Sequence, residues 1–150
     1  MKTLNRRKFL NKSCPILLST IVGSTLLQYC TAEEIAEQAP ISGGYSVSGN
    51  VLTIDLSHSD FGALDSKGWI NFTSQNLLLL KKSATEYKAF TNICPHERVK
   101  NKWSYSASTQ KFTCHEHDNA YSSDCATAGK GGVLDCYKVA LSGTQLKVYL

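Results

Sequence analysis

The sequence lacks, beyond its first 32 residues, the apolar period of 3.6 residues that marks amphipathic helices. It also lacks internal repeats and low-complexity tracts, and its 150 residues leave little room for a second domain. Acidic residues are absent from residues 1–30, which hold five lysines and arginines. Residues 31–150 hold 11 basic and 12 acidic residues. Because this part has no basic excess, we expect no nucleic acid as a partner.

What the sequence does contain is a series of short strand signals separated by polar turns. The clearest hairpin pairs residues 45–48 with residues 51–56 across Gly49-Asn50. Further strands are expected at residues 69–72, 76–81, 87–93, 103–106, 110–113, 135–141 and 144–150. The even spacing of strands and turns predicts an all-β domain of the sandwich or barrel-like kind, with antiparallel strands, over residues 45–150.

The first 32 residues resemble an export signal. A basic segment is followed by the uncharged residues 13–32, which are rich in leucine, isoleucine and valine. Within the basic segment, Arg6-Arg7 is followed by a polar residue, a phenylalanine and a leucine. This order resembles the twin-arginine signal. The resemblance implies a route that carries proteins already folded, often with a cofactor inserted.

The end of this leader leaves three outcomes open. Cys30 stands where a lipoprotein would be cleaved and acylated, although Tyr29 occupies a position that usually holds a small residue. Residues 13–32 are alternatively long enough to remain as a membrane anchor. Simple cleavage near Ala32 is the third outcome. In all three, the folded domain lies outside the cytoplasm, on the periplasmic side of the membrane. The polar residues 33–44 are expected to form a tether.

The chemistry is expected at two short motifs. Cys94 and His96 are separated by one residue, and Cys114 and His117 by two. Two thiolates and two imidazoles make a four-ligand set for a metal centre. The intervening residues 98–113 carry strand and turn signals, and a hairpin stem there would bring the two motifs together.

These motifs resemble those of the Rieske [2Fe–2S] family, in which each of two loops supplies one cysteine and one histidine. The resemblance implies that Cys94 and Cys114 bind the iron that stays ferric. It implies that His96 and His117 bind the iron that gains the electron. Tyr121 matches a family tyrosine whose hydroxyl forms a hydrogen bond with a ligand sulfur.

Three features depart from the family pattern. Val99 and Glu116 stand where respiratory members carry two cysteines that tie the cluster loops together. Asn119 replaces a serine that donates to a bridging sulfide, although its amide can still donate. Asp118 replaces a glycine. Because fewer donors and a nearby carboxylate both favour the oxidised cluster, we predict a midpoint potential below the top of the family's range, roughly −150 to +300 mV.

Two further cysteines, Cys125 and Cys136, are left over. In an oxidising compartment such a pair usually forms a disulfide. They flank the glycine-containing residues 126–135, where the family runs a third loop beside its cluster. We hypothesise that a disulfide here braces the cluster in place of the absent inter-loop bridge; the alternative is two buried free thiols.

Three functions remain open on this basis. The favoured one is a free or membrane-tethered one-electron carrier in the periplasm. It would not be an enzyme by itself, and it would serve redox partner proteins, for which a link to quinol stays open. The second is the Rieske subunit of a larger redox complex, of the quinol–cytochrome or molybdenum oxidase type. The third is a structural zinc module, although a Cys-x-His half-site is uncommon for zinc. Basic side chains near the motifs form a solvated face or steer an acidic partner: Arg98, Lys100, Lys102 and Lys111.

Overall fold

The computed structural model describes residues 43–100 and 102–150, so the expected export signal, Cys30 and most of the tether lie outside the described residues. Within the described residues the chain forms ten strands and three short helical turns. The strands are β1 (Tyr45–Ser48), β2 (Val51–Asp55), β3 (Trp69–Phe72), β4 (Leu77–Lys81), β5 (Tyr87–Thr91), β6 (Trp103–Ser106), β7 (Lys111–Cys114), β8 (Asn119–Ser122), β9 (Cys136–Ser142) and β10 (Gln145–Tyr149). The helical turns are η1 (Ser59–Phe61), α1 (Ala63–Ser66) and η2 (Thr73–Gln75).

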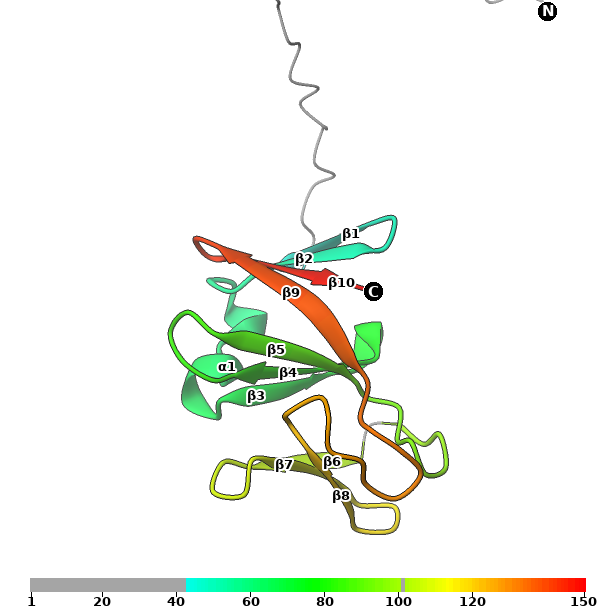
Figure 1. Cartoon of the computed structure of the whole chain (residues 1–150). Helices are drawn as coiled ribbons and strands as arrows, with labels where there is room; N and C mark the ends of the chain where they lie inside the picture. The colour runs from blue at the N-terminus through cyan, green and yellow to red at the C-terminus, as the bar shows by residue number, and fades with distance from the viewer. Residues whose placement is uncertain (1–42, 101) are drawn as a thin grey trace, which may run out of the picture. The chain divides into compact units, whose positions relative to one another are not determined.

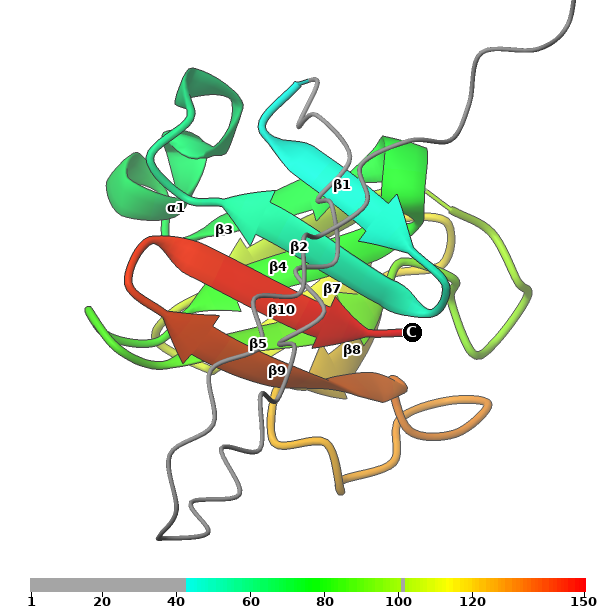
Figure 2. The same ribbon diagram turned by 90° about the horizontal axis from the view of Figure 1, so that it is seen from above.

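The strands form two antiparallel sheets. One has the order β1-β2-β10-β9-β5-β4-β3, and the other has the order β6-β7-β8. β9 connects the two halves of the larger sheet, because its first residues pair with β5 and its later ones pair with β10. Figure 1 shows β1, β2 and β10 above, β3–β5 in the middle and β6–β8 below. Figure 2 shows the same layers from above.

The leucines of β4 join two hydrophobic cores. Leu77 and Leu79 pack in a core with residues of β2 and β10, whereas Leu78 and Leu80 pack in a second core with residues of the small sheet. All four are at most 1% exposed. Because successive strand residues point to opposite faces, β4 is covered on both sides. The second core therefore fixes the small sheet, which carries half of the predicted ligands, against the larger one.

The prediction of an all-β domain is confirmed, and the strands lie close to their expected positions. The expected hairpin closes at Gly49-Asn50, with Ser48 opposite Val51. The sequence analysis missed β8, because its four residues directly follow the ligand motif and show little alternation. It also missed the helical turns, because one turn is too short to display a period. No helix among the described residues is both long enough and apolar enough to cross a membrane.

Candidate metal centre

Two loops carry the four predicted ligands. The first links β5 to β6 and contains Cys94 and His96. The second links β7 to β8 and contains His117, and Cys114 is the last residue of β7 just before it. β6 and β7 are antiparallel neighbours, with Trp103 opposite Cys114. The strand that follows the first loop thus lies beside the strand that precedes the second. This pairing brings the loops together, as the sequence predicts.

Cys94 and Cys114 are free thiols that lie beside each other, each 1% exposed. Burial raises the pKa of each thiol. At Cys94, hydrogen bonds with Tyr121, with Cys114 and with backbone N–H groups outweigh burial, so its pKa lies below the ordinary thiol value. At Cys114 burial prevails, and the pKa lies above that value. Thiolates are the form that binds metal, so both cysteines would lose their protons when a metal binds.

Tyr121 in β8 stands next to this sulfur pair. Its Oη lies 3.4 Å from Sγ of Cys94 and donates a hydrogen bond of 2.7 Å to the carbonyl of Lys130. Burial raises the pKa of Tyr121 well above its ordinary value, and the hydrogen bond with Cys94 adds to this effect. The hydroxyl therefore keeps its proton. The structure places it beside the sulfur of a predicted ligand, where the family resemblance puts it.

The two predicted histidine ligands also lie together. The ring centroids of His96 and His117 are 5.0 Å apart and the rings meet edge to face. Their side chains are 18% and 43% exposed, so the imidazoles reach the surface whereas the sulfurs do not. Nδ2 of Asn119 lies 3.1 Å from Nδ1 of His96. The sequence analysis assigned this amide to a bridging sulfide, and in the structure its contact is with the ring.

Glu97 is a residue of this site that the sequence analysis missed. Its carboxylate oxygens lie 3.8 Å from Nε2 of His96 and 3.7 Å from Nε2 of His117. The sequence analysis named Asp118 as the nearby carboxylate, but Asp118 is 82% exposed and contacts Nδ1 of His115 at 3.1 Å. Its position in the sequence could have indicated this role, because Glu97 directly follows the predicted ligand His96 in a short loop.

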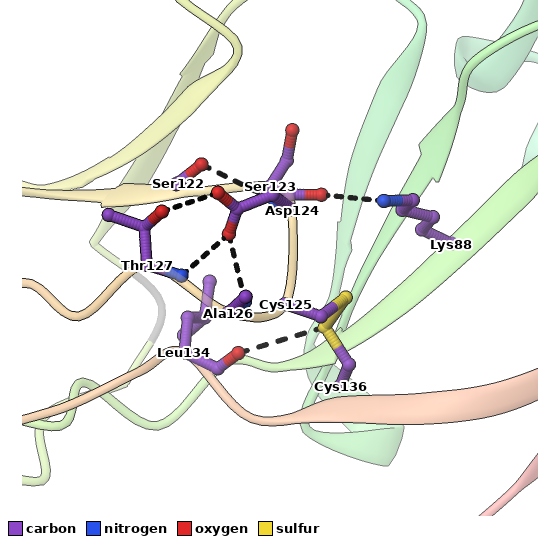
Figure 3. Close-up of a disulfide and its surroundings, with 9 residues drawn as sticks. All are labelled: Lys88, Ser122, Ser123, Asp124, Cys125, Ala126, Thr127, Leu134 and Cys136. Atoms are coloured by element: carbon purple, nitrogen blue, oxygen red, sulfur yellow. Dashed lines mark hydrogen bonds between the residues drawn. A yellow bond between two sulfur atoms is a disulfide. The ribbon is translucent and has the colours of Figure 1, made fainter.

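A third loop, residues 123–135 between β8 and β9, lies against the first ligand loop and β8. The structure joins Cys125 and Cys136 by a disulfide with 5.7 Å between their Cα atoms (Figure 3). The Asp124 carboxylate accepts hydrogen bonds of 2.8 Å from the N–H groups of Ala126 and Thr127. Hydrogen bonds from the Thr127 hydroxyl and from these amides hold the pKa of Asp124 far below its ordinary value. The loop is therefore fixed at its first residues.

The basic side chains near the site are partly engaged. Nζ of Lys100 donates a hydrogen bond of 3.0 Å to Oδ1 of Asn76. Lys102 forms an ion pair with Glu116, and this pair lowers the pKa of the Glu116 carboxyl. The positive charge of Lys102 is therefore compensated locally, and steering of an acidic partner by these residues stays a prediction.

The arrangement of the donors fits the predicted cofactor. Two sulfurs lie together in the interior, and two imidazoles lie together toward the surface. Such pairing of like donors suits a centre in which two cysteines bind one iron and two histidines bind the other. The chemistry such a donor set supports is reversible transfer of one electron.

Comparison with known proteins finds a family model that matches the sequence. The model of the Rieske [2Fe-2S] domain matches residues 55–138, a range that includes all four predicted ligands and both disulfide cysteines. No curated protein matches the sequence. A similar solved structure is the cyanobacterial plasma membrane Rieske protein PetC3 from Synechocystis PCC 6803. The identity is 17%, the match covers 59% of this chain and 93% of that one, and the TM-score is 0.46.

Proposed function

The chain belongs to the Rieske [2Fe–2S] family, and we propose that it is an exported, membrane-tethered protein that passes single electrons between redox partners. Membership rests on the match over residues 55–138, which is more than half of the chain. The cofactor is accordingly a Rieske-type [2Fe–2S] cluster, and its chemistry is one-electron transfer. The alternative of a structural zinc ion at these four residues is therefore abandoned.

In the proposed site, Cys94 and Cys114 hold one iron and His96 and His117 hold the other. The observation that carries the assignment is the grouping of like donors, with buried sulfurs on one side and the edge-to-face rings on the other. Tyr121 supports it, because its hydroxyl lies 3.4 Å from Sγ of Cys94 and would donate to a ligand sulfur once it turns from the carbonyl of Lys130. Such a donor stabilises the negative charge that reduction adds.

The exposure of the donors decides where a partner docks. Cys94 and Cys114 are shielded by the protein, whereas the side chain of His117 is 43% exposed and that of His96 is 18% exposed. A partner protein therefore approaches the donor set most closely over the two imidazoles. The proposed route of the electron runs through this ring pair, and the sulfur side serves to bury the site.

Export and tethering form the second part of the proposal and rest on residues outside the described range. Arg6-Arg7 and the uncharged residues after them support twin-arginine export, which would deliver the domain already folded to the periplasmic side. Cys30 supports a lipid anchor, and retention of residues 13–32 is the alternative anchor. Residues 33–44 would then serve as the tether.

Cell fractionation tests this part. For the wild type we expect cluster-bearing protein in the membrane fraction, facing the periplasm. Joint replacement Arg6→Lys and Arg7→Lys should leave the protein in the cytoplasm, and Cys30→Ser should release it from the membrane if the anchor is a lipid. Wild-type protein found only in the cytoplasm would overturn the proposal. Extraction in mild detergent distinguishes a free carrier from a subunit of a complex, because a subunit co-purifies with the other proteins of its complex.

A further inference from the structure

We propose that Glu97 sets the midpoint potential of the centre, because its carboxylate faces the outer nitrogens of both ligand histidines and favours the oxidised form. The inference rests on the proposed function, since it takes His96 and His117 as ligands. It adds a residue outside the four ligands whose charge tunes the site.

The contact geometry singles out this carboxylate. Glu97, His96 and His117 each place one ligand atom within 4.8 Å of the others. Oε1 lies 3.8 Å from Nε2 of His96, and Oε2 lies 3.7 Å from Nε2 of His117. Nδ1 of His96 faces the other way, toward the amide of Asn119. One carboxylate thus spans the outer edges of both rings, while the inner edge of His96 faces the site.

No other charge in the described part of the chain shares this position. Among the described residues, Glu97 has the one carboxylate within 4.0 Å of a ring nitrogen of His96 or His117, and no lysine or arginine among them forms an ion pair with it. The two other acidic residues of the ligand loops are directed elsewhere. Asp118 contacts His115, and Glu116 pairs with Lys102. The negative charge of Glu97 is therefore directed at the rings without a compensating cation.

The sign of the effect follows from the charge of the two redox states. The oxidised centre carries one more positive charge than the reduced centre, so a nearby negative charge stabilises the oxidised form more. The half-buried setting of His96 limits screening of this interaction by solvent and salt. Glu97 therefore lowers the midpoint potential, and its removal raises it.

The proposal is tested by measuring midpoint potentials of the cluster-loaded protein in a redox titration followed by electron paramagnetic resonance. We expect Glu97→Gln to raise the midpoint potential by at least about 28 mV. At the wild-type midpoint this shift lowers the ratio of oxidised to reduced protein about threefold, because a tenfold change in the ratio corresponds to about 59 mV for one electron. Glu97→Lys should raise the potential further, and Glu97→Asp should keep it near the wild-type value. This order depends on charge and would not follow from a merely structural role.

Two matched variants serve as controls. Glu116→Gln changes the net charge equally and lies next to His117 in the second ligand loop, but its carboxylate is paired with Lys102. Glu86→Gln removes a carboxylate in the turn between β4 and β5. We expect a small shift for the first and none for the second. Intact cluster signals with the same potential in wild type, Glu97→Gln and Glu97→Lys would overturn the proposal, as would an equal shift in Glu116→Gln. Wild-type protein without a cluster would instead overturn the proposed function.

Discussion

Gly131 of the third loop lies directly against His96 of the first ligand loop. A Cβ on Gly131 would stand 2.7 Å from Cα of His96 and 2.8 Å from the carbonyl carbon of Pro95. The φ angle of Gly131 is +87°, in the region that favours glycine. The third loop therefore supports the backbone of a proposed ligand through a contact that only a residue without a side chain allows.

Gly131→Ala should consequently weaken both folding and cluster retention. Gly132→Ala is the matched control, because Gly132 also has a positive φ but has no atom within 4 Å of its Cβ position. Both changes add backbone strain of roughly 1–3 kcal/mol. Overpacking against His96 adds about 1–3 kcal/mol for Gly131→Ala alone. Thermal unfolding together with iron content measures the difference, and equal losses in both variants would show that the close contact is unimportant.

Tyr121→Phe should lower the midpoint potential. The change removes a hydroxyl 3.4 Å from Sγ of Cys94, and a donor at a ligand sulfur stabilises the reduced, more negative state. In the protein without its cluster the same single hydroxyl donates to the carbonyl of Lys130, and losing that hydrogen bond costs about 1 kcal/mol in unfolding free energy. Tyr105→Phe removes a hydroxyl from the same small sheet, where Tyr105 packs on Phe112, and should leave the potential unchanged. Voltammetry that finds no difference between the two variants contradicts the proposed role of Tyr121.

The disulfide should contribute to stability. Joint replacement Cys125→Ala and Cys136→Ala opens a short loop, which in the chain-entropy model costs roughly 2–3 kcal/mol of unfolding free energy. Denaturant unfolding measures this loss. Adding a reductant should destabilise the wild type but not the double variant. If the cysteines brace the cluster, the double variant should also lose iron faster; an unchanged rate of iron loss would remove the bracing hypothesis while leaving the disulfide itself in place.

Asp124 should make stability depend on acid pH. Its pKa is lowered in the folded protein, so its hydrogen bonds stabilise the fold fully above the ordinary carboxyl pKa of 3.8. That contribution is lost as the pH falls below this value toward the lower folded pKa. Asp124→Asn removes the titrating group. Melting temperatures of the two proteins should therefore differ at pH 7 and converge in acid, and a constant difference across this range would contradict the assignment.

That the four predicted ligands lie close together was predictable from the sequence, because the pattern that predicts it is local. The short spacings of Cys94 with His96 and of Cys114 with His117 place each pair on one loop, and the strand signals between them predict the hairpin that joins the loops. The all-β fold was predictable for a similar reason, since strand and turn signals follow each other without a helical period. These features need no knowledge of distant contacts.

Features set by tertiary packing were less accessible. The burial of both faces of β4 shows only once the small sheet covers Leu78 and Leu80. The position of Glu97 depends on how the two ligand loops meet, and the sequence analysis therefore chose Asp118 as the carboxylate near the rings. The close contact of Gly131 with His96 likewise joins segments that are distant in sequence.

The electron resonance spectrum of the reduced protein, recorded with the iron and acid-labile sulfide content of the same sample, tests the central claim most directly. The account predicts two irons and two sulfides per chain and a signal of low average g, typical of a cluster with two cysteine and two histidine ligands. Protein without iron, or a spectrum typical of a cluster held by four cysteines, would contradict it.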